Sequence, residues 1–185
     1  MYRYVMTGLF AAACVAGGGA LQAQEQTKMV GGAAMYPSKD IVTNAMNSKD
    51  HTTLVAAVKA AGLVETLQGT GPFTVFAPTN AAFAKLPAGT VDTLLAPDNK
   101  AMLKNVLTYH VVPGRLDANA LMAQARKNDG KAELTTVSGG KLWVVLAGDK
   151  LSLRDGKGVN AAITTADVYQ SNGVIHVIDT VVMNK

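Results

Sequence analysis

The chain contains three histidines, His51, His110 and His176, and these side chains are the best suited to acid–base chemistry or to metal binding. A metal site needs ligands that converge, and its usual sequence signs are short spacings such as His-x-His or a cysteine partner. Neither sign occurs among these three residues. We therefore expect no metal site and no cofactor, and we expect His51 to be a solvated residue at the start of a helix.

Other patterns that could support catalysis are also missing from the sequence. The one cysteine, Cys14, lies in a segment that we expect to be removed, and no Gly-x-Ser-x-Gly nucleophile elbow occurs. Gly139-Gly140-Lys141 lacks the further glycine and the hydroxyl of a phosphate loop, and residues 149–160 lack the acidic spacing of a calcium loop. Arg154-Asp155-Gly156 is typical of a turn, and its carboxylate is too far in sequence from Asp179 to name an acid–base pair. We predict that the protein is not an enzyme.

Residues 1–23 have the features of a secretory signal peptide. Arg3 supplies a positive start, and residues 5–16 form an apolar, alanine-rich run. Gly17-Gly18-Gly19 interrupts that run before the small residue Ala23, after which we expect cleavage. A membrane-spanning helix needs roughly 20 apolar residues without such an interruption, so cleavage is favoured over a retained anchor.

Processing would change the chemistry of the chain. Cleavage after Ala23 leaves no cysteine, and Ala11-Ala12-Ala13-Cys14 resembles a lipoprotein acylation site only faintly because no leucine stands three residues before the cysteine. Cleavage also removes Arg3 and no acidic residue, which lowers the formal net charge from +4 to about +3. With 5% aromatic residues and no Lys/Arg-rich run, a nucleic-acid partner is not expected. Loose attraction to acidic glycans or anionic surfaces and an ordinary solvated surface both stay open.

The rest of the sequence predicts one α+β domain, because helical patterns come first and strand patterns later. Hydrophobic residues make up 49% of the chain, which is enough for a core, and no internal repeat divides it. Helical spacing and capping residues predict helices near residues 38–46, 52–61, 63–67, 81–85, 98–108 and 116–126. Apolar or alternating runs predict strands at 73–76, 109–112, 134–137, 142–146, 151–153, 161–168 and 174–183. We assign residues 1–23 to the signal peptide, 24–35 to a flexible lead-in and 36–184 to the domain.

Three segments resemble the signature motifs of fasciclin (FAS1) domains, and they occur in the family's order. Thr70–Phe83 looks like the first signature box, Asn172–Asp179 looks like the second, and Tyr109-His110 is similar to the tyrosine-histidine motif between them. The segment Met35–Val42 also resembles small secreted bacterial fasciclin proteins. The box residues taken as a structural signature are Phe73, Val75, Phe76, Pro78, Thr79, Asn80, Phe83, Gly173, Val174, Ile175, His176, Val177, Ile178 and Asp179.

The resemblance implies a wedge-shaped fold, in which several short helices pack along one side of a β-sandwich. It also implies a role in cell adhesion, matrix contact or symbiotic surfaces, and no established catalytic centre. The large apolar residues of the boxes indicate a structural role, because burial of Phe73, Val75 or Phe83 is worth about 1.5–3 kcal/mol each. His176 and Asp179 fall on opposite faces of the last predicted strand, which argues against a catalytic pair.

Tyr109 and His110 are the candidate partner-binding residues. In animal fasciclin domains the tyrosine-histidine motif is associated with integrin-dependent adhesion, and the resemblance carries that association to these two positions. They follow a predicted helix and precede the Pro113-Gly114 turn, so we expect part of the pair to reach the surface. The alternative is that His110 makes a hydrogen bond inside the core, with Tyr109 packed beside it.

We therefore expect an exported fasciclin-domain protein for adhesion or interaction, which binds a protein or polysaccharide at the cell surface, in the matrix or in the periplasm. The alternative is a periplasmic small-ligand-binding protein or minor enzyme with a cleft near Tyr109-His110. A closed apolar pocket of roughly several hundred Å³ would favour the alternative. A flat surface with an exposed apolar patch would favour adhesion. No stable membrane span is expected after processing.

Overall fold

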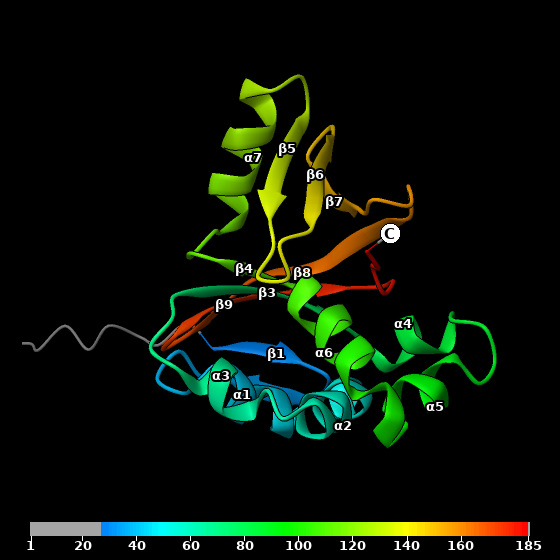
Figure 1. The fold of residues 1–185 in the computed structure, drawn as a ribbon. Helices are drawn as coiled ribbons and strands as arrows, with labels where there is room; N and C mark the ends of the chain where they lie inside the picture. Colours follow the sequence, from blue (N-terminus) through cyan, green and yellow to red (C-terminus); the bar gives the residue numbers. More distant parts are fainter. Residues whose placement is uncertain (1–26, 185) are drawn as a thin grey trace, which may run out of the picture.

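The computed structural model describes residues 27–184, so the predicted signal peptide lies outside the described residues. Within them, most helices come in the first part of the chain and most strands in the last (Figure 1). The α-helices are α1 (Ile41–Asn47), α2 (Thr52–Ala61), α3 (Val64–Gln68), α4 (Asn80–Ala84), α5 (Thr90–Leu95), α6 (Lys100–Tyr109) and α7 (Ala118–Lys127), with short 3-10 turns η1 (Lys49–His51) and η2 (Pro97–Asn99). The strands are β1 (Lys28–Val30), β2 (Ala33–Met35), β3 (Phe73–Pro78), β4 (Val111–Pro113), β5 (Lys131–Thr135), β6 (Lys141–Ala147), β7 (Lys150–Arg154), β8 (Asn160–Gln170) and β9 (Gly173–Ile178).

Seven of these strands form one sheet in the order β4-β3-β9-β8-β7-β6-β5. The pair β3 and β9 is parallel, and the other neighbours are antiparallel. The eleven-residue strand β8 joins the two halves of the sheet, since it pairs with β7 through residues 160–162 and with β9 further along. Irregularities between Ile163 and Val168 interrupt its pairing with β9. Such bulges increase the local twist and let a sheet curl.

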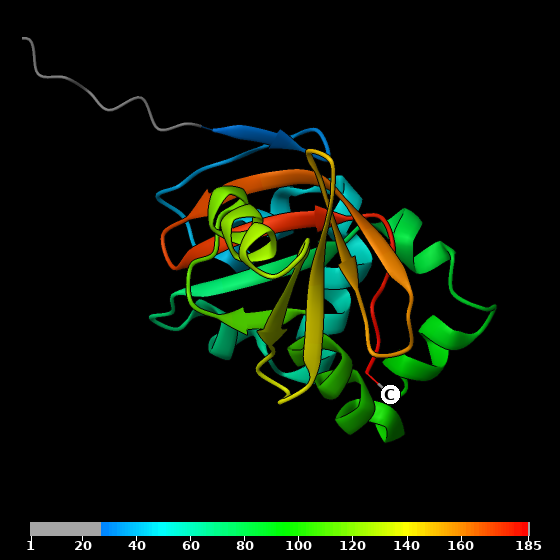
Figure 2. The ribbon, with the colours of Figure 1, turned by 90° about the horizontal axis from the view of Figure 1, so that it is seen from above.

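The curl brings the two ends of the sheet together, so that its halves act as the two layers of the predicted sandwich. After β5, the Val137 amide donates to the Val111 carbonyl of β4 at 2.8 Å, which nearly closes the sheet. Figure 2 shows β5, β6 and β7 folded over the strands β3, β9 and β8. The expected α+β wedge with short helices along one side is confirmed (Figure 1).

Two hydrophobic cores follow from this arrangement, one on each face of the central strands. The first core lies between the sheet and the helices, and it includes Val30, Met35, Ile41, Val42, Leu54, Val58, Val75, Leu103, Leu107, Ile175 and Val177. The second core lies within the curl under α7, and it includes Phe76, Tyr109, Leu121, Leu142, Val144, Leu153, Ile178 and Val182. Because β3 and β9 are covered on both faces, they are apolar at nearly every position instead of alternating.

Capping residues explain where several helices start. Asp40, Thr79 and Asp117 precede α1, α4 and α7, and each side chain accepts a hydrogen bond from a backbone amide of the first turn. A cap of this kind is worth about 1 kcal/mol. Thr79 is therefore the N-cap of α4.

Residues 28–35 form a β-hairpin, so the flexible lead-in predicted for residues 24–35 is wrong over that stretch. Val30 and Met35 are buried in the first core, and the Lys28 ammonium donates to the Ala166 carbonyl of β8 at 2.6 Å. The folded body therefore begins before Tyr36. Two short strands with one buried side chain each give too weak an alternation to be recognised in the sequence.

Three other boundaries differ from the sequence prediction. Helix α5 was not predicted; it follows Gly89, whose backbone has a positive φ of 81°. Tyr109 belongs to the end of α6 and not to the next strand. β9 ends at Ile178; beyond it the Val182 and Met183 amides donate to the side chains of His110 and Asp155 instead of to a neighbouring strand.

Candidate functional site

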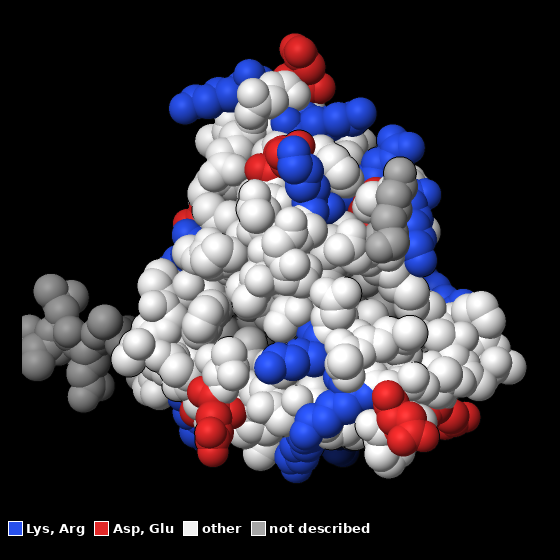
Figure 3. All heavy atoms as spheres, viewed as in Figure 1, with Lys and Arg blue, Asp and Glu red and all other residues white. Residues whose placement is uncertain are grey.

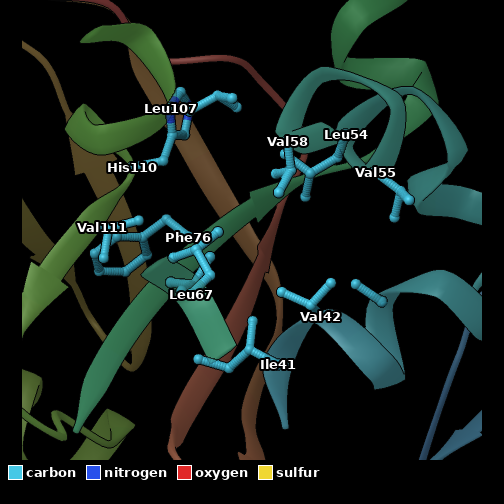
Figure 4. Close-up of a pocket in the computed structure, with 12 residues that line it drawn as sticks. Ile41, Val42, Leu54, Val55, Val58, Leu67, Phe76, Leu107, His110 and Val111 are labelled. Carbon is cyan, nitrogen blue, oxygen red and sulfur yellow. The ribbon is translucent and has the colours of Figure 1, made fainter. Parts of the chain in front are cut away.

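Tyr109 and His110 lie where α6 ends beneath the closing edge of the sheet. Their exposed fractions are 0% and 2%, so the expectation that part of the pair reaches the surface is wrong, and the alternative of a core position describes the structure. The reason is tertiary: the Val137 amide after β5 bonds to Val111, which follows the pair, and the Val182 amide of the C-terminal segment bonds to the His110 ring. Figure 4 shows the His110 ring beside Leu107, at the edge of a pocket whose other walls are apolar side chains of α1 and α2.

Both nitrogens of the His110 ring have backbone partners. Nδ1 lies 2.8 Å from the Val106 carbonyl oxygen, and Nε2 lies 3.2 Å from the Val182 amide nitrogen. Since a carbonyl accepts and an amide donates, the ring is neutral with its proton on Nδ1. Burial lowers the pKa of His110 to about 4, although the Val106 bond and the nearby Asp155 carboxylate act in the opposite direction. The imidazole therefore holds α6 to the C-terminal segment and has no free nitrogen for acid–base work.

The Tyr109 hydroxyl links two other segments. It donates to the Lys141 carbonyl at the start of β6 at 2.5 Å and accepts from the Gly156 amide at 3.3 Å. Burial raises the pKa of the phenol, so it stays a donor at neutral pH. The ring packs so closely on Gly140 that a Cβ there would lie 2.6 Å from a ring carbon. Tyr109 thus fixes the turn before β6 and the loop after β7.

Asp155 completes this network, and sequence reasoning treated it only as part of a turn. Its side chain is 3% exposed, and its Oδ1 accepts from the amides of Lys157 and Val159 at 2.9 and 2.8 Å. Its Oδ2 accepts from the Met183 amide at 3.0 Å. The turn itself is confirmed, because Gly158 donates to the Asp155 carbonyl. An Asp-Gly pair followed by a second glycine is the local signal for such an Asx turn, but nothing local predicts the bond to Met183.

The residues of the first signature box lie in β3 and α4. Val75, Phe76, Pro78 and Phe83 are buried and Phe73 is partly buried; Phe76 stacks on His176 with ring centroids 5.6 Å apart. Asn80 is a connector: its Oδ1 accepts from the Thr53 amide, and its Nδ2 donates to the Lys49 carbonyl. This packing and bonding is what the predicted scaffold role requires.

Most of the second box lies in β9, where every residue is buried: Gly173, Val174, Ile175, His176, Val177 and Ile178. Asn172, the first residue of the box, bonds α1 and α3: it donates to the Leu67 carbonyl at 2.7 Å and accepts from the Ile41 amide at 3.1 Å. A Cβ at Gly173 would lie 2.0 Å from the Phe73 carbonyl oxygen, so only glycine allows β3 and β9 to pair here.

His176 and Asp179 do not form a pair, as the strand alternation predicted. His176 Nε2 lies 2.8 Å from the Leu116 carbonyl, and burial lowers the pKa of the ring. Asp179 is half-exposed; burial alone would raise the pKa of its carboxyl, but bonds from the Ala162 amide and Lys85 outweigh burial and lower it. Each side chain therefore holds another part of the fold: His176 bonds to Leu116, and Asp179 bonds to Ala162 and Lys85.

The expectation that His51 is solvated is wrong. It is 2% exposed instead of solvated, its Nδ1 is 2.8 Å from the Ser48 hydroxyl, and burial lowers its pKa. The hairpin β1–β2, which the sequence did not predict, contributes Val30 and Met35 to the small apolar space beside this ring. Within residues 27–184, no three His, Cys, Asp or Glu side chains come together as metal ligands.

The apolar cavity next to His110 measures only about 30 Å³ and lies between α1, α2, α6 and β3 (Figure 4). That space is about the share of one water molecule in the liquid, far below the size of an ordinary ligand site. The buried pair therefore does not open onto a cleft for a small molecule.

Three comparisons relate the chain to known proteins. The sequence model described as Fasciclin domain matches residues 49–184. Protein sll1483 of Synechocystis is 47% identical over 167 residues, covering 88% of this chain and 83% of its own length. Cell surface glycolipoprotein MPB83 of Mycobacterium bovis is 37% identical, over 83% of this chain and 63% of its own length. A solved FAS1 domain pair from the insect cell adhesion molecule fasciclin I superposes with a TM-score of 0.71 at 18% identity, over 80% of this chain and 52% of that one.

Proposed function

The chain belongs to the fasciclin domain family, and on that premise we propose that it is an exported, non-catalytic adhesion or interaction protein. Its partner would be a protein or polysaccharide of the cell surface, the matrix or the periplasm. A mycobacterial relative is a cell surface glycolipoprotein and the similar insect structure is of a cell adhesion molecule, and both support this role.

The observation that carries the proposal is that Tyr109 and His110 are buried and bonded to the backbone. Each polar atom of the two side chains is bonded to backbone, and neither side chain is exposed. A general acid or base must reach a substrate, whereas these groups reach backbone atoms of α6, β6, the loop at residues 155–159 and the C-terminal segment. We propose that the pair supports partner binding from beneath by fixing the start of β6 and the loop at residues 155–159, both of which reach the surface.

The small-ligand alternative has less support. The cavity beside His110 is about 30 Å³ and almost wholly apolar in its lining, so a ligand would have to separate the helices of the first core to enter. Open hollows of about 300 Å³ do exist on the surface, and these suit contact with an extended partner better than enclosure of a small one.

The adhesion role is tested with the His110→Ala protein. The substitution leaves the Val182 amide and the Val106 carbonyl without their partner, and we expect the free energy of unfolding to fall by about 1–3 kcal/mol. Beads coated with the unsubstituted domain should adhere to envelope or matrix of the producing cell, and adhesion of His110→Ala beads should fall as its surface segments loosen. Unfolding curves and adhesion are measured on the same preparations. Absence of adhesion by a folded, unsubstituted domain would contradict the proposal.

Export is a separate expectation. Within the described residues, none of the helices has the length and apolar character needed to cross a membrane. We propose cleavage near Ala23, so mass spectrometry of the protein recovered outside the cytoplasm should give a chain that starts near Gln24. A chain that keeps Met1, or one that carries a lipid on Cys14, would contradict this expectation.

A further inference from the structure

The outer face of β5, β6 and β7 carries a row of polar and charged residues over the second core. Leu134, Leu142 and Leu153 point into the core, and the residues between them point out. The register places Glu133 beside Trp143 and Trp143 beside Arg154 across the three strands. Lys and Arg side chains gather on the upper right of the molecule, over β7 and the loop after it (Figure 3).

A hollow of about 330 Å³ opens on this face. It is lined by Lys131, Trp143, Arg154, Asp155, Gly156, Lys157 and Gly158. It is open to the surface, so it suits contact with one part of an extended partner. We call it the basic hollow.

The three cations of the basic hollow, Lys131, Arg154 and Lys157, are not neutralised by neighbours. Ion pairs among residues 27–184 join Lys85 to Asp179, Arg126 to Asp149 and Lys141 to Glu133, and none includes these three. The carboxylate of Asp155 is turned inward, where three backbone amides use it. The hollow therefore presents positive charge that is available to an anionic group.

Trp143 gives the basic hollow an apolar surface as well. It is the only tryptophan of the chain, it is partly exposed, and its indole N–H has no hydrogen-bond partner among the described residues. A flat ring with a free donor can pack against the C–H face of a sugar and donate to one of its oxygens. Nucleic acid is disfavoured as a ligand because a single aromatic residue gives no run of stacking positions.

The floor of the hollow is fixed in place by the buried network. Tyr109 bonds to Gly156, and Asp155 bonds to Lys157 and Val159, so the loop that carries Lys157 cannot move freely. Gly158 has a positive φ of 86°, and a Cβ at that position would lie 3.6 Å from the Arg154 guanidinium. A loop whose backbone is already fixed loses less entropy on binding an anion than a mobile loop.

From these observations we propose that the basic hollow binds acidic polysaccharide. Carboxylate or sulfate groups of the chain pair with Lys131, Arg154 and Lys157, and one sugar ring packs on Trp143. Arg154 is suited to this role because its guanidinium can bind a carboxylate or sulfate through two parallel hydrogen bonds. The inference rests on the proposed function, for which it names the partner and the surface.

The test is a titration of the mature domain with hexagalacturonate and with a sulfated hexasaccharide, followed by Trp143 fluorescence; maltohexaose is the neutral probe. We expect the acidic oligosaccharides to change the fluorescence and maltohexaose to leave it unchanged. The Arg154→Gln/Lys157→Gln protein should bind about tenfold more weakly or worse, since two charge-assisted contacts are lost. The matched control is Lys59→Gln/Lys104→Gln, which removes the same charge from exposed positions of α2 and α6. It should bind like the unsubstituted protein.

Several results would overturn the inference. Equal weakening in the control would show attraction to net charge without a site, and equal binding of maltohexaose would exclude recognition of the acidic groups. Tighter binding of a single-stranded oligonucleotide through the same two residues would assign the hollow to nucleic acid. Unfolding curves confirm that both double variants are folded. If beads still adhere to the envelope while the acidic oligosaccharides do not bind, the inference fails and the proposed function stands; if both are absent, both fail.

Discussion

Acidification from pH 7 to pH 4.5 is expected to lower the free energy of unfolding by about 2–3 kcal/mol through His110 alone. The ring is buried and neutral in the folded protein, where burial lowers its pKa from 6.5 to about 4. In the unfolded chain the same ring takes up a proton near pH 6.5. The unfolded state therefore binds more protons between these two values, so stability is complete above pH 6.5 and is lost as the pH falls toward 4.

His51 and His176 act in the same direction, because burial also lowers the pKa of each ring. The carboxyls of Asp40 and Asp179 have pKa values lowered below 3.8, so these two stay ionised above pH 4.5 and contribute little in this window. Denaturant unfolding at a series of pH values from 7.5 to about 4.5 measures the effect.

The matched variant for this prediction is His110→Gln. Glutamine cannot reach both the Val106 carbonyl and the Val182 amide, so the variant should be less stable at pH 7. It cannot titrate, and its stability should therefore change less between pH 7 and pH 4.5, by about the 2–3 kcal/mol assigned to His110. If both proteins show the same pH dependence, the buried ring is not the source of the acid sensitivity.

Replacement of Asp155 by alanine is expected to cost at least about 3 kcal/mol of folding free energy. The change removes the charged acceptor of three partly buried amides, those of Lys157, Val159 and Met183, and each hydrogen bond to a charged group is worth about 1.5–3 kcal/mol. Chemical denaturation of the two proteins at pH 7 gives the difference directly.

Asp155→Asn separates the two halves of this network. Its carbonyl oxygen can still accept from Lys157 and Val159, but its amide group then faces the N–H of Met183, donor to donor. We expect a smaller loss of about 1–3 kcal/mol, with faster hydrogen exchange at Met183 and retained protection at Lys157 and Val159. Equal stability of Asp155→Ala and the unsubstituted protein would show that the C-terminal segment is held by other contacts.

Much of the fold could be read from local patterns. The helices at residues 41–47 and 52–61 and the strand at 73–78 have clear signals, namely a capping aspartate, apolar residues at helical spacing and a short apolar run after Gly71-Pro72. The signals were insufficient where an element depends on its neighbours. The hairpin at residues 28–35 is ordered by the first core, and the short helix α5 packs on α6.

The candidate site was predicted only as residue positions. Tyr109-His110 could be recognised as a motif, but its burial results from β5 and the C-terminal segment, which follow it by more than 20 residues in the chain. Asp155 had the composition of a turn, and its bond to Met183 spans 28 residues. Trp143 had no local pattern at all, because its role depends on the register that places Arg154 beside it.

The periodicity of the elements, the caps and the family motifs can be recognised in the sequence, since each is a pattern of neighbouring residues, and the absence of cysteine from residues 24–185 follows from composition. Which polar side chains are exposed depends on tertiary contacts. The fold buries His51, His110 and Asp155 and leaves Lys131, Arg154 and Lys157 around a hollow, because a sheet that curls at β8 brings distant segments over some residues and leaves others uncovered. Burial and charge at the surface depend on contacts between distant segments, and no local pattern records them.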